Sequence, residues 1–165
     1  RMPLSPSLFE ELALEESRTT HTAMVFKSDQ LREIFPILCG STDITHEENV
    51  LFNGLHLIVE AMLHPQPALY DRALPIDIDK RIKHNLQHLI TPSAANPQAP
   101  AVPSFFVEIK APSEDEILVR CWARYNRALG ARTMHSLRNY SRDEPVYDGH
   151  DNTFTATYHP GTGIL

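Results

Sequence analysis

Apolar residues follow helical spacing in some segments of the chain and strand-like spacing in others. One stripe of helical spacing runs through residues 41–65 and predicts a helix there; its members are Val50, Leu51, Leu55, Ile58, Val59 and Met62. Another helix is expected across residues 77–90, ending before Pro92. Residues 6–16 and 28–40 predict two further helices near the start of the chain.

The second half of the chain predicts a strand, a long helix and another strand. A proline-rich loop, residues 91–103, leads into the apolar strand "SFFVEIK". Ser113 and Glu116 have the spacing of a capping box and open the long helix. We expect one face of this helix to pack on the core; its residues are Ile117, Cys121, Tyr125 and Ala128, joined by Leu118, Trp122 and Leu129. Another stripe carries cations, namely Arg120, Arg124 and Arg127. The segment "NTFTATY" then alternates like a strand, so the fold class is α/β.

Length and composition fit one globular domain. The chain has 165 residues, and no apolar run approaches the roughly 18 residues of a membrane-spanning helix. We therefore expect no membrane partner. Cys39 and Cys121 fall in different predicted helices and offer neither a disulfide framework nor metal-ligand spacing, which favours an intracellular location.

Charge is distributed unevenly along the chain. The net charge is -6, yet residues 110–142 carry 7 basic and 3 acidic side chains, whereas residues 1–50 carry 4 basic and 9 acidic ones. A local basic stripe on an acidic protein still attracts phosphate, because binding depends on the electrostatic field at the site and not on the net charge. The alternative interpretation is that these basic side chains form a solvated helix face without a ligand.

Glu108 and Lys110 end the apolar strand, two residues apart, so both side chains lie on one face of it. Phosphodiester cleavage with Mg²⁺ or Mn²⁺ requires carboxylates that hold the metal ion and a cation that stabilises charge on the phosphate. This strand would supply one group of each kind. The two residues alone favour an ordinary ion pair, worth about 0–1 kcal/mol.

An apolar strand with Glu-x-Lys followed by a helix with a cationic face resembles the PD-(D/E)XK, or restriction-endonuclease-like, nuclease fold. The stretches "VPSFFVEIKAP", "ALGARTMHSLRNY" and "EPVYDGHDNTFTATYHPGT" are similar to the C-terminal region of a group of fungal proteins with that fold. The resemblance covers residues 46–165 and implies an αβββαβ core, preceded by a helical extension at residues 1–45. We expect the chain to stop within a C-terminal hairpin.

The resemblance also implies a site. Asp71 and Glu108 would hold Mg²⁺ or Mn²⁺, and Lys110 would stabilise the phosphate in the transition state or orient water. The nucleic-acid-binding residues would be Arg120, Arg124 and Arg127.

The chain departs from the family pattern at three places. Ala68 stands where the family has the Asp of a Pro-Asp pair, Trp122 stands at a frequent Gln, and "APSED" replaces Gly-Pro-Asp-Gly. Asp71, three residues after Ala68, would then be the second carboxylate. Two functions remain open: a metal-dependent nuclease-like domain that acts on or binds nucleic acid, and an inactive nuclease-derived domain for protein interaction or assembly.

Two other metal sites are weaker hypotheses. His84 and His88 have zinc-ligand spacing, but no Glu follows the first His as in a zinc peptidase helix. Residues 148–152, "DGHDN", lack the alternating ligands and closing Glu of a calcium loop, and a turn is the better interpretation.

Overall fold

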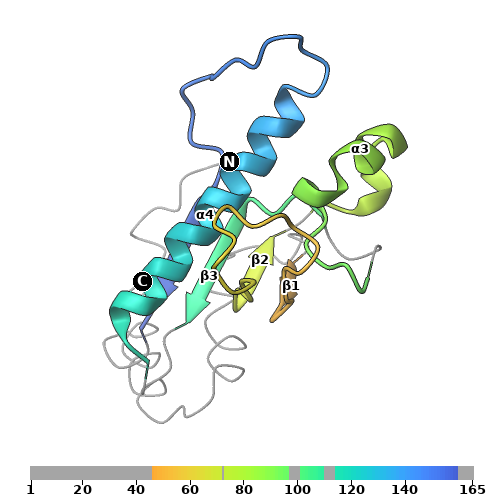
Figure 1. Ribbon diagram of the computed structural model, residues 1–165. Helices are drawn as coiled ribbons and strands as arrows, with labels where there is room; N and C mark the ends of the chain where they lie inside the picture. The colour runs from red at the N-terminus through yellow and green to blue at the C-terminus, as the bar shows by residue number, and fades with distance from the viewer. Residues whose placement is uncertain (1–45, 72, 97–100, 110–113, 160–165) are drawn as a thin grey trace, which may run out of the picture.

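The computed structural model describes residues 46–71, 73–96, 101–109 and 114–159, which form a four-stranded mixed sheet and two α-helices (Figure 1). The strands are β1 (His46–Glu48), β2 (Leu69–Asp71), β3 (Phe105–Ile109) and β4 (Phe154–Tyr158), and they lie side by side in this order. The pairs β1–β2 and β2–β3 are antiparallel, and β3–β4 is parallel. The mixed α/β character predicted from the sequence is confirmed.

Several predictions fall on residues outside the described part of the chain. They are the helices at residues 6–16 and 28–40, the helical extension at residues 1–45, the side chains of Lys110 and Ser113, and the hairpin after residue 159.

The long helix α4 (Glu116–Arg138) connects β3 to the parallel strand β4 and packs against both (Figure 1). It begins one residue after Asp115, whose carboxylate accepts a hydrogen bond from the Ile117 backbone N–H at 2.8 Å. Asp115 is therefore the N-cap, and it satisfies a backbone donor that the helix itself leaves open.

The buried face of α4 agrees with the predicted one at Leu129 and differs from it at most other positions. Its buried residues are Val119, Ala123, Asn126, Leu129, Gly130 and Thr133. Ile117, expected in the core, is 71% exposed, and Cys121 and Ala128 are also exposed. A Cβ added to Gly130 would lie 2.9 Å from a ring carbon of Phe106 and 2.7 Å from Thr153, so the helix approaches β3 closely at a residue without a side chain. Small residues therefore mark the buried face.

The helix expected across residues 41–65 does not form in the described portion, residues 46–65. After β1, Asn49 takes a left-handed φ of 53°, and an irregular loop follows up to β2. Three backbone donors of this loop bond to distant carbonyls instead of to the preceding turn: Phe52 to Pro65, Gly54 to Pro92 and His56 to His88. These long-range bonds satisfy the backbone groups that a helix would satisfy locally, which explains the wrong prediction.

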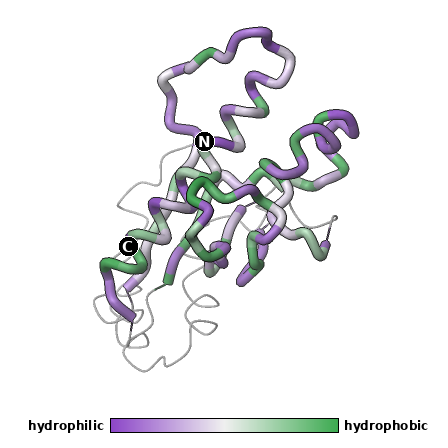
Figure 2. Tube along the Cα trace, viewed as in Figure 1, coloured by the Kyte–Doolittle hydropathy of each residue, from purple (hydrophilic) through white to green (hydrophobic). Residues whose placement is uncertain are grey.

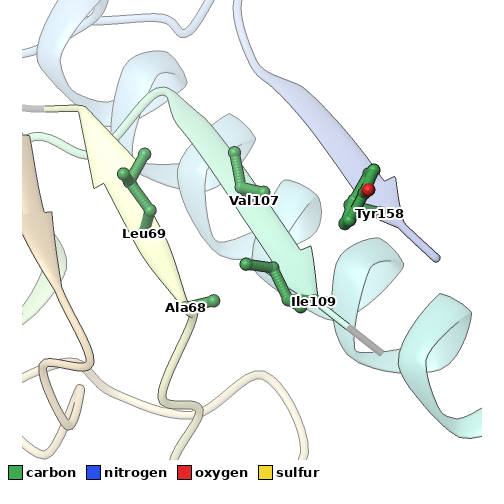
Figure 3. Packing of buried hydrophobic residues seen from close by; sticks show 5 residues of the cluster. All are labelled: Ala68, Leu69, Val107, Ile109 and Tyr158. Carbon is green, nitrogen blue, oxygen red and sulfur yellow. The ribbon is translucent and has the colours of Figure 1, made fainter. Parts of the chain in front are cut away.

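Burial in this loop does not follow the helical stripe either. Phe52 and Leu55 are buried with Tyr70 and Phe106 in one hydrophobic cluster. The stripe residues Leu51, Ile58 and Val59 are exposed. A second cluster joins β2, β3 and β4 through Ala68, Leu69, Val107, Ile109 and Tyr158 (Figure 3).

The predicted helix at residues 77–90 is confirmed as α3 (Lys80–Ile90), which follows a short 3-10 helix, η2 (Pro75–Asp77). Asp79 caps α3 by accepting hydrogen bonds from the backbone N–H groups of Arg81 and Ile82. The hydroxyl of Thr133 on α4 donates to the carbonyl of Leu89, so the two helices are joined near the end of α3.

A long, mostly hydrophilic loop, residues 139–153, connects α4 to β4 (Figure 2). Asn139 fixes its base by donating to the carbonyl of Val146 and accepting from the N–H of the same residue. The ring of Tyr147 stacks on His135 with centroids 4.4 Å apart. These contacts hold the loop against the C-terminal half of α4.

Among the described residues, no helix is long and apolar enough to cross a membrane.

Candidate functional site

Glu108 lies in β3 beneath α4 and is only 8% exposed. The side-chain amide of Asn126, fully buried on α4, donates a hydrogen bond of 2.5 Å to Glu108 Oε1. This hydrogen bond joins β3 to α4 in the interior of the protein. Asn126 was missed by the sequence analysis. The spacing of Ala123, Asn126 and Gly130 would have identified it, because small residues three and four apart mark a close helix contact.

Ala68 directly precedes β2 (Leu69–Asp71). Leu69 pairs with Val107 in the β2–β3 register, so one further step of a regular ladder would bring Ala68 level with Glu108, and its side chain belongs to the cluster of Val107 and Ile109. The backbone supports this continuation, because Asn49 N–H donates to the Ala68 carbonyl and so extends the β1–β2 ladder to the same position. Ala68 is 4% exposed and carries no metal-binding atom in its side chain.

Asp71 occupies the other end of the β2–β3 pair. Continuing the same register places Asp71 opposite Phe105, three ladder positions from Ala68, or about 10 Å along the strand. Its Oδ1 accepts backbone N–H bonds from Ser104 at 2.9 Å and Phe105 at 2.6 Å, and its Oδ2 accepts from the Ser104 hydroxyl at 2.9 Å. Asp71 therefore fixes the entry of the chain into β3.

The expected metal ligands are thus separated. Asp71 is engaged at the start of β3, while Glu108 is held by Asn126 near its end. Within the described part of the chain, no group of three or more His, Cys, Asp or Glu side chains is placed to hold a metal ion. The zinc candidate His88 stacks instead on His56, with ring centroids 4.6 Å apart. Lys110 lies outside the described residues.

The three arginines expected to contact nucleic acid lie on the exposed side of α4. Arg120 forms an ion pair of 2.6 Å with Glu116, and Arg127 forms one of 2.9 Å with Asp151 in the loop after the helix. Arg124, between them, makes no hydrogen bond or ion pair within the residues that the structure describes. The arginine stripe of α4 therefore contains one cation without a counter-charge among the described residues, Arg124, between two exposed ion pairs.

The last turns of α4 use their cations to hold other segments. Arg138 bonds to Asp148 and Asn152, so the "DGHDN" segment is held against the helix as irregular chain, and Gly149 there has a φ of 72°. Arg132 donates to the carbonyl of His56, and burial lowers the pKa of its guanidinium below the ordinary value, partly offset by the charge of Tyr125. These side chains stabilise the fold.

Aromatic residues of α4 also contribute to packing. The Tyr125 hydroxyl accepts a hydrogen bond of 3.1 Å from the Ile58 backbone N–H, and its ring meets Trp122 edge to face at 6.3 Å. Tyr125 thereby anchors the irregular loop before β2.

Comparison with known proteins finds no family model, no curated protein and no solved structure that matches this chain.

Proposed function

We propose that this chain is a nuclease-like domain of the restriction-endonuclease-like fold that binds nucleic acid and has lost metal-dependent cleavage. The order of elements supports the fold: three antiparallel strands, a helix, and a fourth strand parallel to the third follow the βββαβ part of an αβββαβ core. Glu108 lies in the third of these strands, where that core carries its metal-binding carboxylate.

The loss of cleavage rests on one observation: the residue one step beyond the Leu69–Val107 pair, level with Glu108, is Ala68, whose side chain has no oxygen. A hard divalent ion needs several oxygen ligands, and a single protein carboxylate holds it weakly. Asp71 does not replace the missing ligand, because three donors from Ser104 and Phe105 engage its carboxylate about 10 Å further along the strand.

Binding of nucleic acid rests on the arginine stripe. Arg120, Arg124 and Arg127 are spaced four and three residues apart, so they share one face of α4. Arg124 is uncompensated, and the ion pairs of the other two are exposed, which makes each worth about 0–1 kcal/mol. Phosphate groups of a nucleic acid backbone compete with such weakly held carboxylates.

The test measures binding of a fluorescent DNA duplex by anisotropy as a function of salt. The double variant Arg124→Glu and Arg127→Gln removes two phosphate contacts, so it should weaken binding and reduce the slope of log K against log salt by about 2. Gln at position 127 avoids placing a like charge beside Asp151. Arg81→Glu on α3, where Arg81 has only a 3.8 Å contact with Asp79, is the matched control and should leave the slope unchanged.

The same experiment separates the two functions that the sequence left open. No duplex binding by the wild-type chain at about 50 mM salt would refute the nucleic-acid proposal and favour a protein-interaction or assembly module. Equal loss in the Arg81→Glu control would show that net charge, rather than the α4 stripe, governs retention. Nicking of plasmid by the unmodified chain with Mn²⁺ would refute the loss of cleavage.

A further inference from the structure

A cavity of about 440 Å³ lies between α3 and two loop segments that run past its side, near residues 53–56 and 91–94. None of its lining residues belongs to β3 or α4, so it is distinct from the site around Glu108. Its volume is within the range of about 300–1,000 Å³ that is typical of small-molecule sites.

Hydrogen bonds hold together the two loop segments beside the cavity. Gly54 N–H donates to the Pro92 carbonyl at 2.7 Å, and Ala94 N–H donates to Asn53 Oδ1 at 2.9 Å. A Cβ at Gly54 would lie 2.5 Å from the Thr91 carbonyl oxygen, so only glycine permits this approach. The cavity is therefore built into the fold.

One wall of the cavity is basic. It consists of four side chains of α3: Lys80, Lys83, His84 and His88. Their spacing of three, four and eight residues from the first places them along one side of the helix over about 12 Å. No acidic side chain is among the described residues that line the cavity. Lys80 and His84 make no hydrogen bond or ion pair within the described part of the chain.

The acidic residue next to Lys80 in sequence, Asp79, is engaged at the start of α3. Asp79, beside Lys80 in sequence, accepts two backbone N–H bonds at the start of α3 and contacts Arg81 Nε at 3.8 Å. The Asp79 carboxylate is therefore engaged by the N-terminus of α3 and by Arg81.

Neutral polar groups complete the lining. Thr91 is 9% exposed, and its buried hydroxyl has no hydrogen-bond partner among the described residues. A buried polar group without a partner is uncommon in native proteins and calls for an explanation. Gln87 lies on the same side of α3, with its amide nitrogen 3.3 Å from His88 Nε2. The ring of His88 is held by stacking on His56.

We propose that this cavity binds a small molecule that carries at least two phosphate groups, such as pyrophosphate or a nucleoside diphosphate. Lys80 and Lys83, together with the ring nitrogens of His84 and His88 further along α3, offer phosphate-binding groups over about 12 Å, which exceeds the reach of one phosphate group and matches several. Lysine binds phosphate as a point charge, and Thr and Gln supply hydrogen bonds to its oxygens. This inference does not depend on the proposed nucleic-acid function, because it uses no residue of the α4 stripe.

The test is isothermal titration calorimetry of the full chain with sodium pyrophosphate, with sodium sulfate at equal ionic strength as the reference anion. We expect saturable binding of pyrophosphate and at least about tenfold weaker binding of sulfate. The variant Lys80→Gln with His84→Gln should lose at least about tenfold in pyrophosphate affinity. Arg81→Gln, adjacent on α3 but outside the lining, should change the affinity by less than about twofold.

Three outcomes would overturn the inference. Equal affinity for pyrophosphate and sulfate would indicate unspecific screening, and equal affinity in the Lys80→Gln, His84→Gln variant would place binding elsewhere. Failure of pyrophosphate to bind, together with duplex DNA binding that this variant loses, would assign the cavity to a nucleic acid backbone. Since all substituted side chains are exposed, melting curves should confirm that the variants remain folded.

Discussion

Placing a carboxylate at position 68 tests most directly the proposal that this chain lacks one metal ligand. Ala68→Asp puts an acidic side chain at a position that is 4% exposed and directly precedes β2, the strand beside the buried Glu108. Without metal, the two carboxylates should repel each other and destabilise the fold. With Mn²⁺, the same pair becomes a ligand set, so the loss should be recovered.

The size of the effect is worked out for a regular ladder continued to positions 68 and 108. Directly opposed residues of an antiparallel pair would then have Cβ atoms about 4.5–5.5 Å apart. Two unit charges about 5 Å apart repel by about 3 kcal/mol at an effective dielectric constant of about 20. Since about 1 kcal/mol shifts the Tm of a domain of this size by about 2–4 °C, the variant should melt about 6–12 °C lower in EDTA. Mn²⁺ at about 100 times its Kd returns about 2.7 kcal/mol and should restore most of this shift.

Thermal melting in EDTA and in Mn²⁺ is the assay, applied to four proteins. Wild type and Ala68→Asn, which adds a neutral side chain of similar shape, should show little response to Mn²⁺. Ala68→Asp should respond strongly, and Ala68→Asp with Glu108→Gln should lose the response because one ligand and the repulsion disappear together. Mn²⁺-dependent nicking of plasmid by Ala68→Asp, abolished by Lys110→Ala, would extend the result to catalysis. Identical melting of Ala68→Asp in EDTA and Mn²⁺ would refute the convergence of positions 68 and 108.

Two further predictions concern residues that position the site. Asp71→Asn should lower the free energy of unfolding, measured in urea, by about 1–3 kcal/mol, because an amide replaces a carboxylate that accepts backbone N–H bonds from Ser104 and Phe105. Asp77→Asn at an exposed position is the control. Equal stability of the two variants would contradict the role of Asp71 at the start of β3. Gly130→Ala should destabilise the protein by up to about 2 kcal/mol. Overpacking against Phe106 and Thr153 costs about 1–3 kcal/mol, and the higher helix propensity of Ala offsets about 1 kcal/mol of this cost. Ala128→Gly at an exposed position of α4 measures the propensity contribution alone, and a stabilised Gly130→Ala would show that the helix shifts freely.

Elements with local signals were predictable from the sequence. α3 has its cap at Asp79 and its end before Pro92, and β3 and β4 show apolar or alternating patterns between turn residues. The segment after β1 was not predictable, because its helical stripe competes with long-range bonds to the Pro65, Pro92 and His88 carbonyls. Such bonds have no signature in a window of 18 residues.

The buried face of α4 was predicted wrongly for a related reason. Large apolar residues such as Ile117 suggested a core stripe, yet the sheet contacts a face built around Gly130 and Asn126. A glycine inside a long helix costs about 1 kcal/mol relative to Ala, so its presence already indicates a close approach of another element. Residues three and four positions from Gly130 share its helix face, so taking Gly130 as the contact point would have placed Asn126 beside the sheet and identified the partner of Glu108.

Sequence distance alone was a poor guide to the second carboxylate of the predicted metal site. Asp71 follows Ala68 by three residues, and sequence distance alone makes it the nearest substitute. In a sheet, however, proximity to Glu108 is decided across the ladder, where Ala68 is opposite and each further residue adds about 3.3 Å. To bind a metal ion beside Glu108, Asp71 would have to cross about 10 Å and release three hydrogen bonds, each to a charged acceptor and worth about 1.5–3 kcal/mol. The same bonds that make Asp71 a good cap for β3 therefore exclude it as a ligand, and a working site would need its second acid at position 68.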